Sequence, residues 1–290
     1  MNQLALAQPN SPYVDFWNTV LVPKFDQWRH ILVGGLGLHS AKVFPQLKLA
    51  TGDAVLDVGC GWGETAIEIA RRVGPGGRVV GLDCCDAFLA AGRADAAQAG
   101  VRNVSFVAAD AETHAFAPGF DVCFSRFGTQ FFQNPVAGLR NMRRALKPGG
   151  IMTRIVWRAR ADNPWLERAR KVLRRYLPPV EESAASCGPG PFSMADPELV
   201  TKQLQIAGYT DPEFKRIDAD VMVGRNVEEA IAFQLAIGPA GEAYRAAGAG
   251  AERKRQILVD ALRAELKDFA SPEGVMMASS SWLVTARNPL

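Results

Sequence analysis

The chain has 290 residues, of which 48% are hydrophobic and 22% charged, and its formal net charge at neutral pH is +3. This composition is typical of an ordinary globular protein with enough apolar material for a sizeable core. The first twelve residues lack a basic segment ahead of an apolar core, which argues against a secretory signal. The apolar run 31–38 is too short to span a bilayer, so we expect no stable membrane insertion.

The five cysteines are odd in number, and none has the spacing of a metal-ligand motif. Cys84 and Cys85 are adjacent, which suits neither a disulfide framework nor a zinc knuckle. We therefore expect a reduced, cytoplasmic protein without a metal site.

Residues 1–50 are predicted to form an N-terminal helical cap. Ser11-Pro12 has the pattern of a helix cap followed by proline at the first helical position. A second helix is expected from Pro23, with apolar residues at helical spacing, and Gly34-Gly35 is expected to end it.

Residues 51–160 alternate between strand and helix patterns. Apolar runs at 53–58, 78–83, 104–110, 120–128 and 151–157 predict five strands, with helical segments after the first, second and fourth. Because each crossover returns to the same sheet, we expect parallel pairing with helices on both faces. The fold class is therefore α/β, a doubly wound, mostly parallel Rossmann-like sheet.

Residues 161–290 are predicted to hold the last core helix, two more strands at 213–223 and 279–287, and helical insertions. This makes a seven-stranded sheet. Together with the N-terminal helices, the insertions at about 164–176 and 226–269 are candidates for a lid over the site.

The stretch VLDVGCGWGETA at 55–66 is a glycine-rich turn between the first strand and the first helix of this core. Gly61 to Ala66 match the dinucleotide pattern G-x-G-x-x-G/A, and Asp83 follows Gly63 by twenty residues at the end of the second strand. An acid at that position can hold a ribose diol. On this evidence, NAD and S-adenosylmethionine are equally compatible with the turn.

Other features favour S-adenosylmethionine. Asp57 stands two residues before the first glycine, where it would repel a pyrophosphate but tolerate a cationic amino group. About fifty helical residues precede the first strand, the third strand ends in Ala108-Ala-Asp110-Ala111, and Lys-Pro-Gly-Gly at 147–150 leads into the fifth strand. Taken together, residues 50–160 resemble the class I S-adenosylmethionine-dependent methyltransferases, in particular the small-molecule group of ubiquinone and menaquinone biosynthesis.

The resemblance implies a cofactor-binding role for particular residues. The turn from Gly59 through Cys60 and Gly61 would pack against the methionine part and ribose, and Asp83 would hold the ribose hydroxyls with Cys84 beside the adenine. Asp110 and the Ala111 N–H would bind the adenine, while the backbone at Ser125 and Arg126 would border the methionine end. Asp57 would touch the ligand or orient the loop.

The acceptor is expected to be small, apolar or anionic, and methylated on oxygen or carbon. The segment after the fourth strand is mostly apolar, and residues expected to line the acceptor pocket are Phe127, Gln130, Trp157 and Arg158. His39 is a candidate general base, with a hydrogen-bonded structural histidine as the alternative. Arg154 and Arg158, in a strongly basic stretch at 140–175, could attract an anion, or the stretch could be a solvated surface.

Two rival functions remain open from the sequence. One is an NAD(P)-dependent oxidoreductase, and the other is a non-catalytic protein that binds S-adenosylmethionine. No nucleic-acid-binding module is recognisable, so a nucleic acid partner is not expected. The identity of the acceptor and the oligomeric state cannot be read from the residues.

Overall fold

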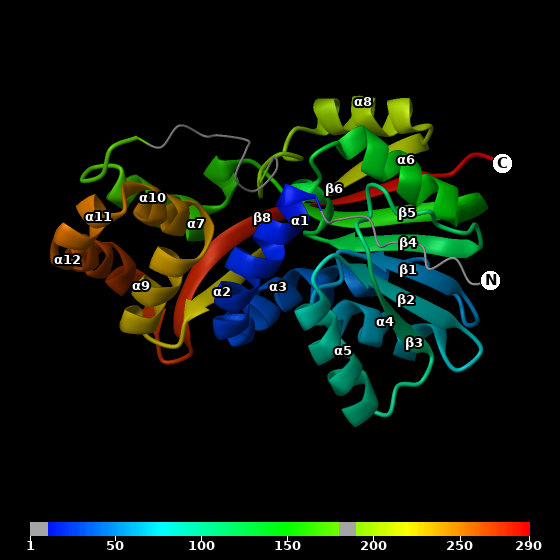
Figure 1. Ribbon diagram of the computed structural model, residues 1–290, viewed down its shortest axis with the longest axis horizontal. Coiled ribbons are helices and arrows are strands. Elements are labelled where there is room, and N and C mark those ends of the chain that lie inside the picture. The colour runs from blue at the N-terminus through cyan, green and yellow to red at the C-terminus, as the bar shows by residue number, and fades with distance from the viewer. Residues whose placement is uncertain (1–10, 180–189) are drawn as a thin grey trace, which may run out of the picture.

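The computed structural model describes residues 11–179 and 190–290, which form a mixed sheet flanked by helices (Figure 1). The sheet order is β3-β2-β1-β4-β5-β8-β6, and the two-residue β7 pairs with β8 alone. The strands are β1 (Ala54–Val58), β2 (Arg78–Asp83), β3 (Val104–Ala108), β4 (Phe120–Arg126), β5 (Leu146–Trp157), β6 (Thr210–Gly224), β7 (Ala270–Ser271) and β8 (Gly274–Arg287). The predicted doubly wound, mostly parallel sheet is confirmed.

Strands β1 to β5 pair in parallel, whereas β8 lies antiparallel between β5 and β6. All five residues of β1 are buried, as expected for a central strand with helices on both faces. The strand order reverses between β1 and β4. In open α/β sheets, ligands bind beyond the carboxyl ends of the strands at such a reversal.

Helices of three kinds surround the sheet. Those of the core are α4 (Glu64–Val73), α5 (Asp86–Gln98), α6 (Pro135–Ala145) and α8 (Pro197–Ala207). The N-terminal ones are α1 (Pro12–Phe16), α2 (Val22–Gln27) and α3 (Arg29–Val43). The remainder, which we call the distal helices, are α7 (Pro164–Leu173), α9 (Val227–Ala236), α10 (Gly238–Ala247), α11 (Ala249–Arg253) and α12 (Arg255–Leu266).

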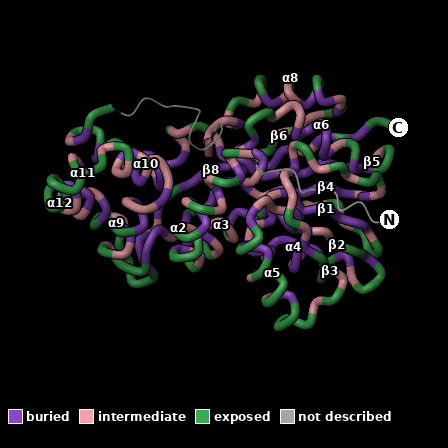
Figure 2. Tube along the Cα trace, viewed as in Figure 1, coloured by how far each residue is buried: buried purple, intermediate pink, exposed green. Residues whose placement is uncertain are grey.

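Two clusters of buried apolar side chains divide between the faces of the sheet. One joins the sheet to α4 and α5 and continues into the N-terminal and distal helices, and the other joins it to α6 and α8. Figure 2 shows buried residues along the central strands, and exposed residues on the outer surfaces of α5, α11 and α12. The distal helices are therefore part of a continuous core.

The long strands β6 and β8 carry the chain from the sheet to the distal helices (Figure 1). Helices α3 and α9 pack on β6, and α7 packs on β8. The N-terminal helices therefore lie between the core and the distal helices, beside the carboxyl ends of the parallel strands.

The prediction that a helix ends at Gly34-Gly35 was wrong, because α3 continues through both glycines to Val43. A Cβ at Gly35 would lie 3.4 Å from the Val221 Cβ on β6, so the missing side chain permits close packing of helix on strand. The predicted cap at Ser11 is present, since its Oγ accepts a hydrogen bond from the Val14 N–H at 3.3 Å.

Among the described residues, none of the helices has both the length and the apolar character that crossing a bilayer requires. The predicted division of the chain at residues 50 and 160 stays a prediction.

Candidate functional site

The glycine turn after β1 has a backbone conformation that other residues rarely adopt. Gly59, Gly61 and Gly63 have φ values of +67°, +54° and +78°. A Cβ at Gly59 would lie 2.9 Å from the Gly128 Cα, so the turn packs backbone to backbone against the segment after β4. Helix α4 begins directly after Gly63. The turn thus sits where the strand order reverses.

Asp83, at the end of β2, holds this turn in place. Its Oδ2 accepts a hydrogen bond from the Gly61 N–H at 2.9 Å, and its Oδ1 accepts one from the Cys85 N–H at 3.0 Å. Burial raises the pKa of Asp83 from its usual value, and the backbone hydrogen bonds oppose that effect. At the end of β3, the Asp110 Oδ1 accepts the Glu112 N–H at 2.8 Å. Both carboxylates lie at the carboxyl ends of neighbouring strands.

Asp57, on β1, is fully buried with one carboxylate oxygen unsatisfied. Its Oδ2 accepts the Thr65 hydroxyl proton at 2.6 Å, whereas Oδ1 has no partner. Burial raises the pKa of Asp57 to about 7, while the Thr65 hydrogen bond and the charge of Arg126 lower it. An unpaired buried oxygen is costly, so a donor is expected to reach it.

Two more buried oxygens in the described part of the chain have no partner near this turn, Glu64 Oε2 and Ser125 Oγ. The Arg126 guanidinium donates hydrogen bonds to Glu64 Oε1 and, at 3.1 Å, to Ser40 Oγ. The side chains around the turn are thus mainly acceptors. The carboxylates of Glu64, Asp83 and Asp110 line the cavity here, and they favour a ligand with cationic or hydrogen-bond-donating groups over a pyrophosphate.

A cavity of about 570 Å³ opens from the glycine turn toward the N-terminal and distal helices. Of the sequence-predicted residues, those that line it are Gly59, Cys60, Gly61, Asp83, Cys84, Asp110, Ala111, Arg126, Phe127, Gln130 and Trp157. A second cavity, of about 250 Å³ between Leu47 and Arg287, contains none of them. The structure therefore brings residues from the ends of all five parallel strands to one volume.

Aromatic rings form the middle of the large cavity. The rings of Phe127 and Trp157 stack with centroids 3.9 Å apart and an angle of 14° between their planes, and Trp165 lies 5.2 Å from Trp157. Phe127 has a φ of +58°, which is unusual for a residue with a side chain and turns the chain sharply after β4. Trp17, directly after α1, also lines the cavity and meets Phe131 edge to face, with ring centroids 5.2 Å apart.

Arginines line the end of the cavity beside the distal helices. These arginines are Arg160, Arg170, Arg174 and Arg245, and one acid, Glu242, lies among them. Arg170 pairs with Glu167 at 2.7 Å, and Arg245 donates to the Ala236 carbonyl at 2.9 Å. We call this region the arginine end and the region around Gly59 to Gly63 the glycine end. The two ends differ in the sign of their charge.

His39 does not line the cavity. It is fully buried, its Nδ1 lies 2.8 Å from Ser281 Oγ, and its Nε2 lies 2.7 Å from Ser279 Oγ. Its ring meets Trp157 edge to face at 5.0 Å. Burial lowers the pKa of His39 to about 4, assisted by the charges of Lys42 and Arg126. This placement favours the alternative of a structural histidine, one that packs against the rings of Phe127 and Trp157.

Arg154 and Arg158 lie outside the cavity as well. Arg158 pairs with Asp162 at 3.3 Å and lies over the Trp282 ring, 4.4 Å from its centroid. Arg154 is fully buried and donates to Met194 Sδ at 2.9 Å. Sequence reasoning missed Arg174 and Arg245 because only the packing of α7 on α10 brings those segments together.

Comparisons with known proteins agree with this geometry. Residues 55–150 match a family model described as a methyltransferase domain. The chain is 37% identical over 130 residues to the ubiquinone/menaquinone biosynthesis C-methyltransferase UbiE of Pseudomonas putida, an alignment that covers 44% of this chain and 51% of the relative. It thus spans about half the length of those relatives. With the UbiE protein of Coxiella burnetii it is 37% identical over 215 residues, covering 69% of this chain and 84% of the relative.

Solved structures share the fold. A Haemonchus contortus phosphoethanolamine N-methyltransferase 2, solved with S-adenosyl-L-methionine, is 17% identical with a TM-score of 0.60 and covers 97% of this chain and 61% of its own. The YcgJ protein of Bacillus subtilis is 16% identical with a TM-score of 0.57 and covers 87% and 98%. From the curated relatives together with the glycine turn, the chain belongs to the class I S-adenosylmethionine-dependent methyltransferases of small molecules, the family that includes UbiE.

Proposed function

We propose that this protein transfers a methyl group from S-adenosylmethionine to an oxygen or carbon atom of a small acceptor. The observation that carries the proposal is a single cavity, which joins the glycine turn to an aromatic and arginine-lined region. Donor and acceptor then meet in the middle of this volume, where the Phe127–Trp157 stack lies. Carbon as the methylated atom is supported by the printed names of the UbiE relatives.

The residues of the glycine end fit the cofactor. In our proposal, Asp83 binds the ribose hydroxyls while keeping its two backbone hydrogen bonds, since a carboxylate offers about four lone-pair sites. Cys84 and Asp110 would lie beside the adenine, with the Ala111 N–H donating to its ring, and the backbone at Ser125 and Arg126 would border the methionine end. Asp57 is fully buried and does not line the cavity, so in our proposal its carboxylate orients the turn and attracts a cationic amino group through its charge rather than by contact.

When bound, the cofactor would supply a methyl group on a sulfonium: in an in-line displacement the bond from the acceptor atom to the methyl carbon forms as the carbon–sulfur bond breaks, and the sulfur leaves as a neutral thioether. The chain's own contribution is to position the acceptor atom and to exclude water, so proximity and orientation carry much of the rate. No histidine among the described residues lines the cavity. A base is needed only for an acceptor that arrives protonated, and the carboxylates that could accept that proton line both ends of the cavity, Glu242 at the arginine end among them.

The arginine end supports an anionic group on the acceptor. An apolar or aromatic body would lie against the Phe127–Trp157 stack, and a carboxylate or phosphate would reach Arg174 and Arg245. This assignment moves the anion-binding role from Arg154 and Arg158, which the sequence suggested, to arginines that line the cavity.

The proposal is tested with S-adenosylmethionine that carries an isotopically labelled methyl group. Aromatic acceptors are offered in matched pairs that differ by one carboxylate, and labelled product is quantified. We expect label in the acidic member of a pair and much less in the neutral member. Preference for neutral members would contradict the role of the arginine end. Cofactor binding without any labelled product across the pairs would favour the non-catalytic alternative.

A further inference from the structure

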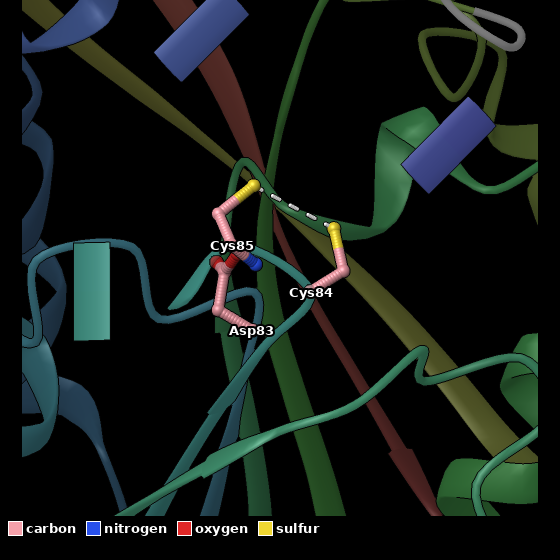
Figure 3. Close-up of side chains that lie close together, drawn as sticks. All are labelled: Asp83, Cys84 and Cys85. Carbon is pink, nitrogen blue, oxygen red and sulfur yellow. Dashed lines mark hydrogen bonds between the residues drawn. The ribbon is translucent and has the colours of Figure 1, made fainter. Parts of the chain in front are cut away.

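Asp83, Cys84 and Cys85 bring two thiols and a carboxylate together at the end of β2 (Figure 3). The two Sγ atoms lie 3.8 Å apart and on the same side of the turn. One ligand atom from each of the three residues lies within 4.8 Å of the others. Adjacent cysteines in an extended segment would point to opposite faces, so the turn is what brings these sulfurs together.

The spacing of the sulfurs matches a shared metal ion. In tetrahedral thiolate sites the metal–sulfur distance is about 2.3 Å, which places two ligating sulfurs about 3.8 Å apart. The observed separation is therefore compatible with both sulfurs binding one ion. The Asp83 carboxylate provides an oxygen as a third ligand, because its two backbone hydrogen bonds leave lone pairs available.

The pair has one accessible member and one protected member. Cys84 lines the large cavity, whereas Cys85 is 1% exposed. The Cys84 and Cys85 thiols are in sulfur–sulfur contact at 3.8 Å, so an ion that enters from the cavity beside Cys84 meets both sulfurs. Hard cations such as Mg²⁺ prefer oxygen ligands and have no comparable affinity for two thiols.

We propose that Asp83, Cys84 and Cys85 form a binding site for one thiophilic divalent cation, of the class of Zn²⁺ or Cd²⁺, reached from the cavity. Two sulfur–metal bonds form, two thiol protons pass to solvent, and the ion gives up water ligands without any change in oxidation state. The spacing of the cysteines in the sequence argued against a metal site here. Spacing does not reveal that the turn after β2 brings the two sulfur atoms within 3.8 Å of each other.

Binding of the cation excludes the cofactor. This second part rests on the proposed function, in which Asp83 holds the ribose and Cys84 lies beside the adenine. Neither side chain can contact the ion and the nucleoside at the same time. The site would therefore make the protein's cofactor binding sensitive to free thiophilic metal.

Cation binding is measured first, with Cd²⁺ and the ultraviolet charge-transfer absorbance of cadmium–thiolate bonds. The protein carries Cys187→Ser throughout, because Cys187 lies outside the described residues and could contribute a thiol. We expect one Cd²⁺ per chain. Cys85→Ser should abolish the band, whereas Cys123→Ser, which removes a buried thiol of β4, should keep it. A band that survives in Cys85→Ser, or no band in the parent protein, would overturn the site.

Competition is measured second, by titrating S-adenosylhomocysteine at a free Cd²⁺ concentration ten times its dissociation constant. Mutual exclusion predicts that the apparent dissociation constant of S-adenosylhomocysteine rises about tenfold in the parent and is unchanged in Cys85→Ser. An unchanged value in the parent would overturn the exclusion. A cadmium band with no S-adenosylhomocysteine binding under any condition would support the cation site and contradict the proposed function, so the two failures are distinguishable.

Discussion

The two ends of the large cavity are built in different ways. The glycine end comes from a short contiguous turn and from acids at the ends of β2 and β3. Carboxylate side chains therefore predominate in its lining. The arginine end comes from segments as distant as Arg160 and Arg245, which meet through the packing of α7 and α10. Local backbone chemistry therefore builds the proposed cofactor end, whereas long-range helix packing builds the proposed acceptor end.

The largest expected effect comes from Asp83→Ala, which acts at the glycine end. Two hydrogen bonds to the carboxylate order the turn, each contributing about 1.5–3 kcal/mol, and the proposed ribose contact is lost as well. We expect the affinity for S-adenosylhomocysteine to fall by about 100-fold in calorimetric titration. Asp86→Ala, at an exposed acid three residues later, is the matched control and should leave affinity unchanged. Equal losses in both variants would contradict the role of Asp83.

Asp57 gives the glycine end a pH dependence. Because its pKa is raised to about 7 in the free protein, Asp57 carries a proton below that pH. A cationic amino group requires the carboxylate form, so this proton must leave when the ligand binds, and affinity weakens as pH falls. We expect the dissociation constant of S-adenosylhomocysteine to be about tenfold higher at pH 6 than at pH 8. Asp57→Asn should flatten this dependence, and tighter binding in acid would contradict it.

Trp157→Leu probes the middle of the cavity. Loss of the ring removes stacking worth about 0.5–1.5 kcal/mol to an aromatic acceptor, so KM for the acceptor should rise about tenfold while cofactor affinity stays constant. Trp282→Leu, on β8 and outside the cavity lining, controls for the general cost of losing a tryptophan. Thermal unfolding confirms that both variants fold. A similar KM change in both variants would remove Trp157 from the acceptor site.

Arg174→Gln tests the arginine end with the smallest expected effect. Arg174 is exposed and lines the cavity, whereas its exposed neighbour Arg175 does not line it. Because an exposed charge interaction contributes about 1 kcal/mol or less, we expect KM for an acidic acceptor to rise about fivefold in Arg174→Gln and to stay constant in Arg175→Gln. The ratio of KM in Arg174→Gln to KM in the unmodified protein should shrink at high ionic strength, because salt screens the charge interaction. Equal KM values for the acidic acceptor in Arg174→Gln and Arg175→Gln would show that the anion is bound elsewhere.

The fold and the glycine end follow from local patterns. Alternating strand and helix signals predicted the parallel sheet, and glycines at 59, 61 and 63 marked the turn because their φ values require glycine. Gly34 and Gly35 led to the wrong prediction of a helix end. Gly35 instead lies within α3, where the missing side chain allows close packing on β6. Tertiary contacts of this kind leave no local pattern.

Arginine placement could not be predicted for the same reason. Arg158 and Arg174 both belong to a basic stretch, yet Arg158, directly after β5, lies over the Trp282 ring of β8, while Arg174, directly after α7, lines the cavity. His39 is a further example, since serines more than 200 residues later in the chain occupy both of its ring nitrogens.

We propose that the glycine end binds S-adenosylmethionine rather than a dinucleotide. This proposal is tested most directly by calorimetric titration of the wild-type protein with S-adenosylhomocysteine, NAD and NADP under identical conditions. We expect micromolar binding of S-adenosylhomocysteine and no detectable heat with either dinucleotide. Binding of NAD or NADP, or the absence of S-adenosylhomocysteine binding, would contradict it.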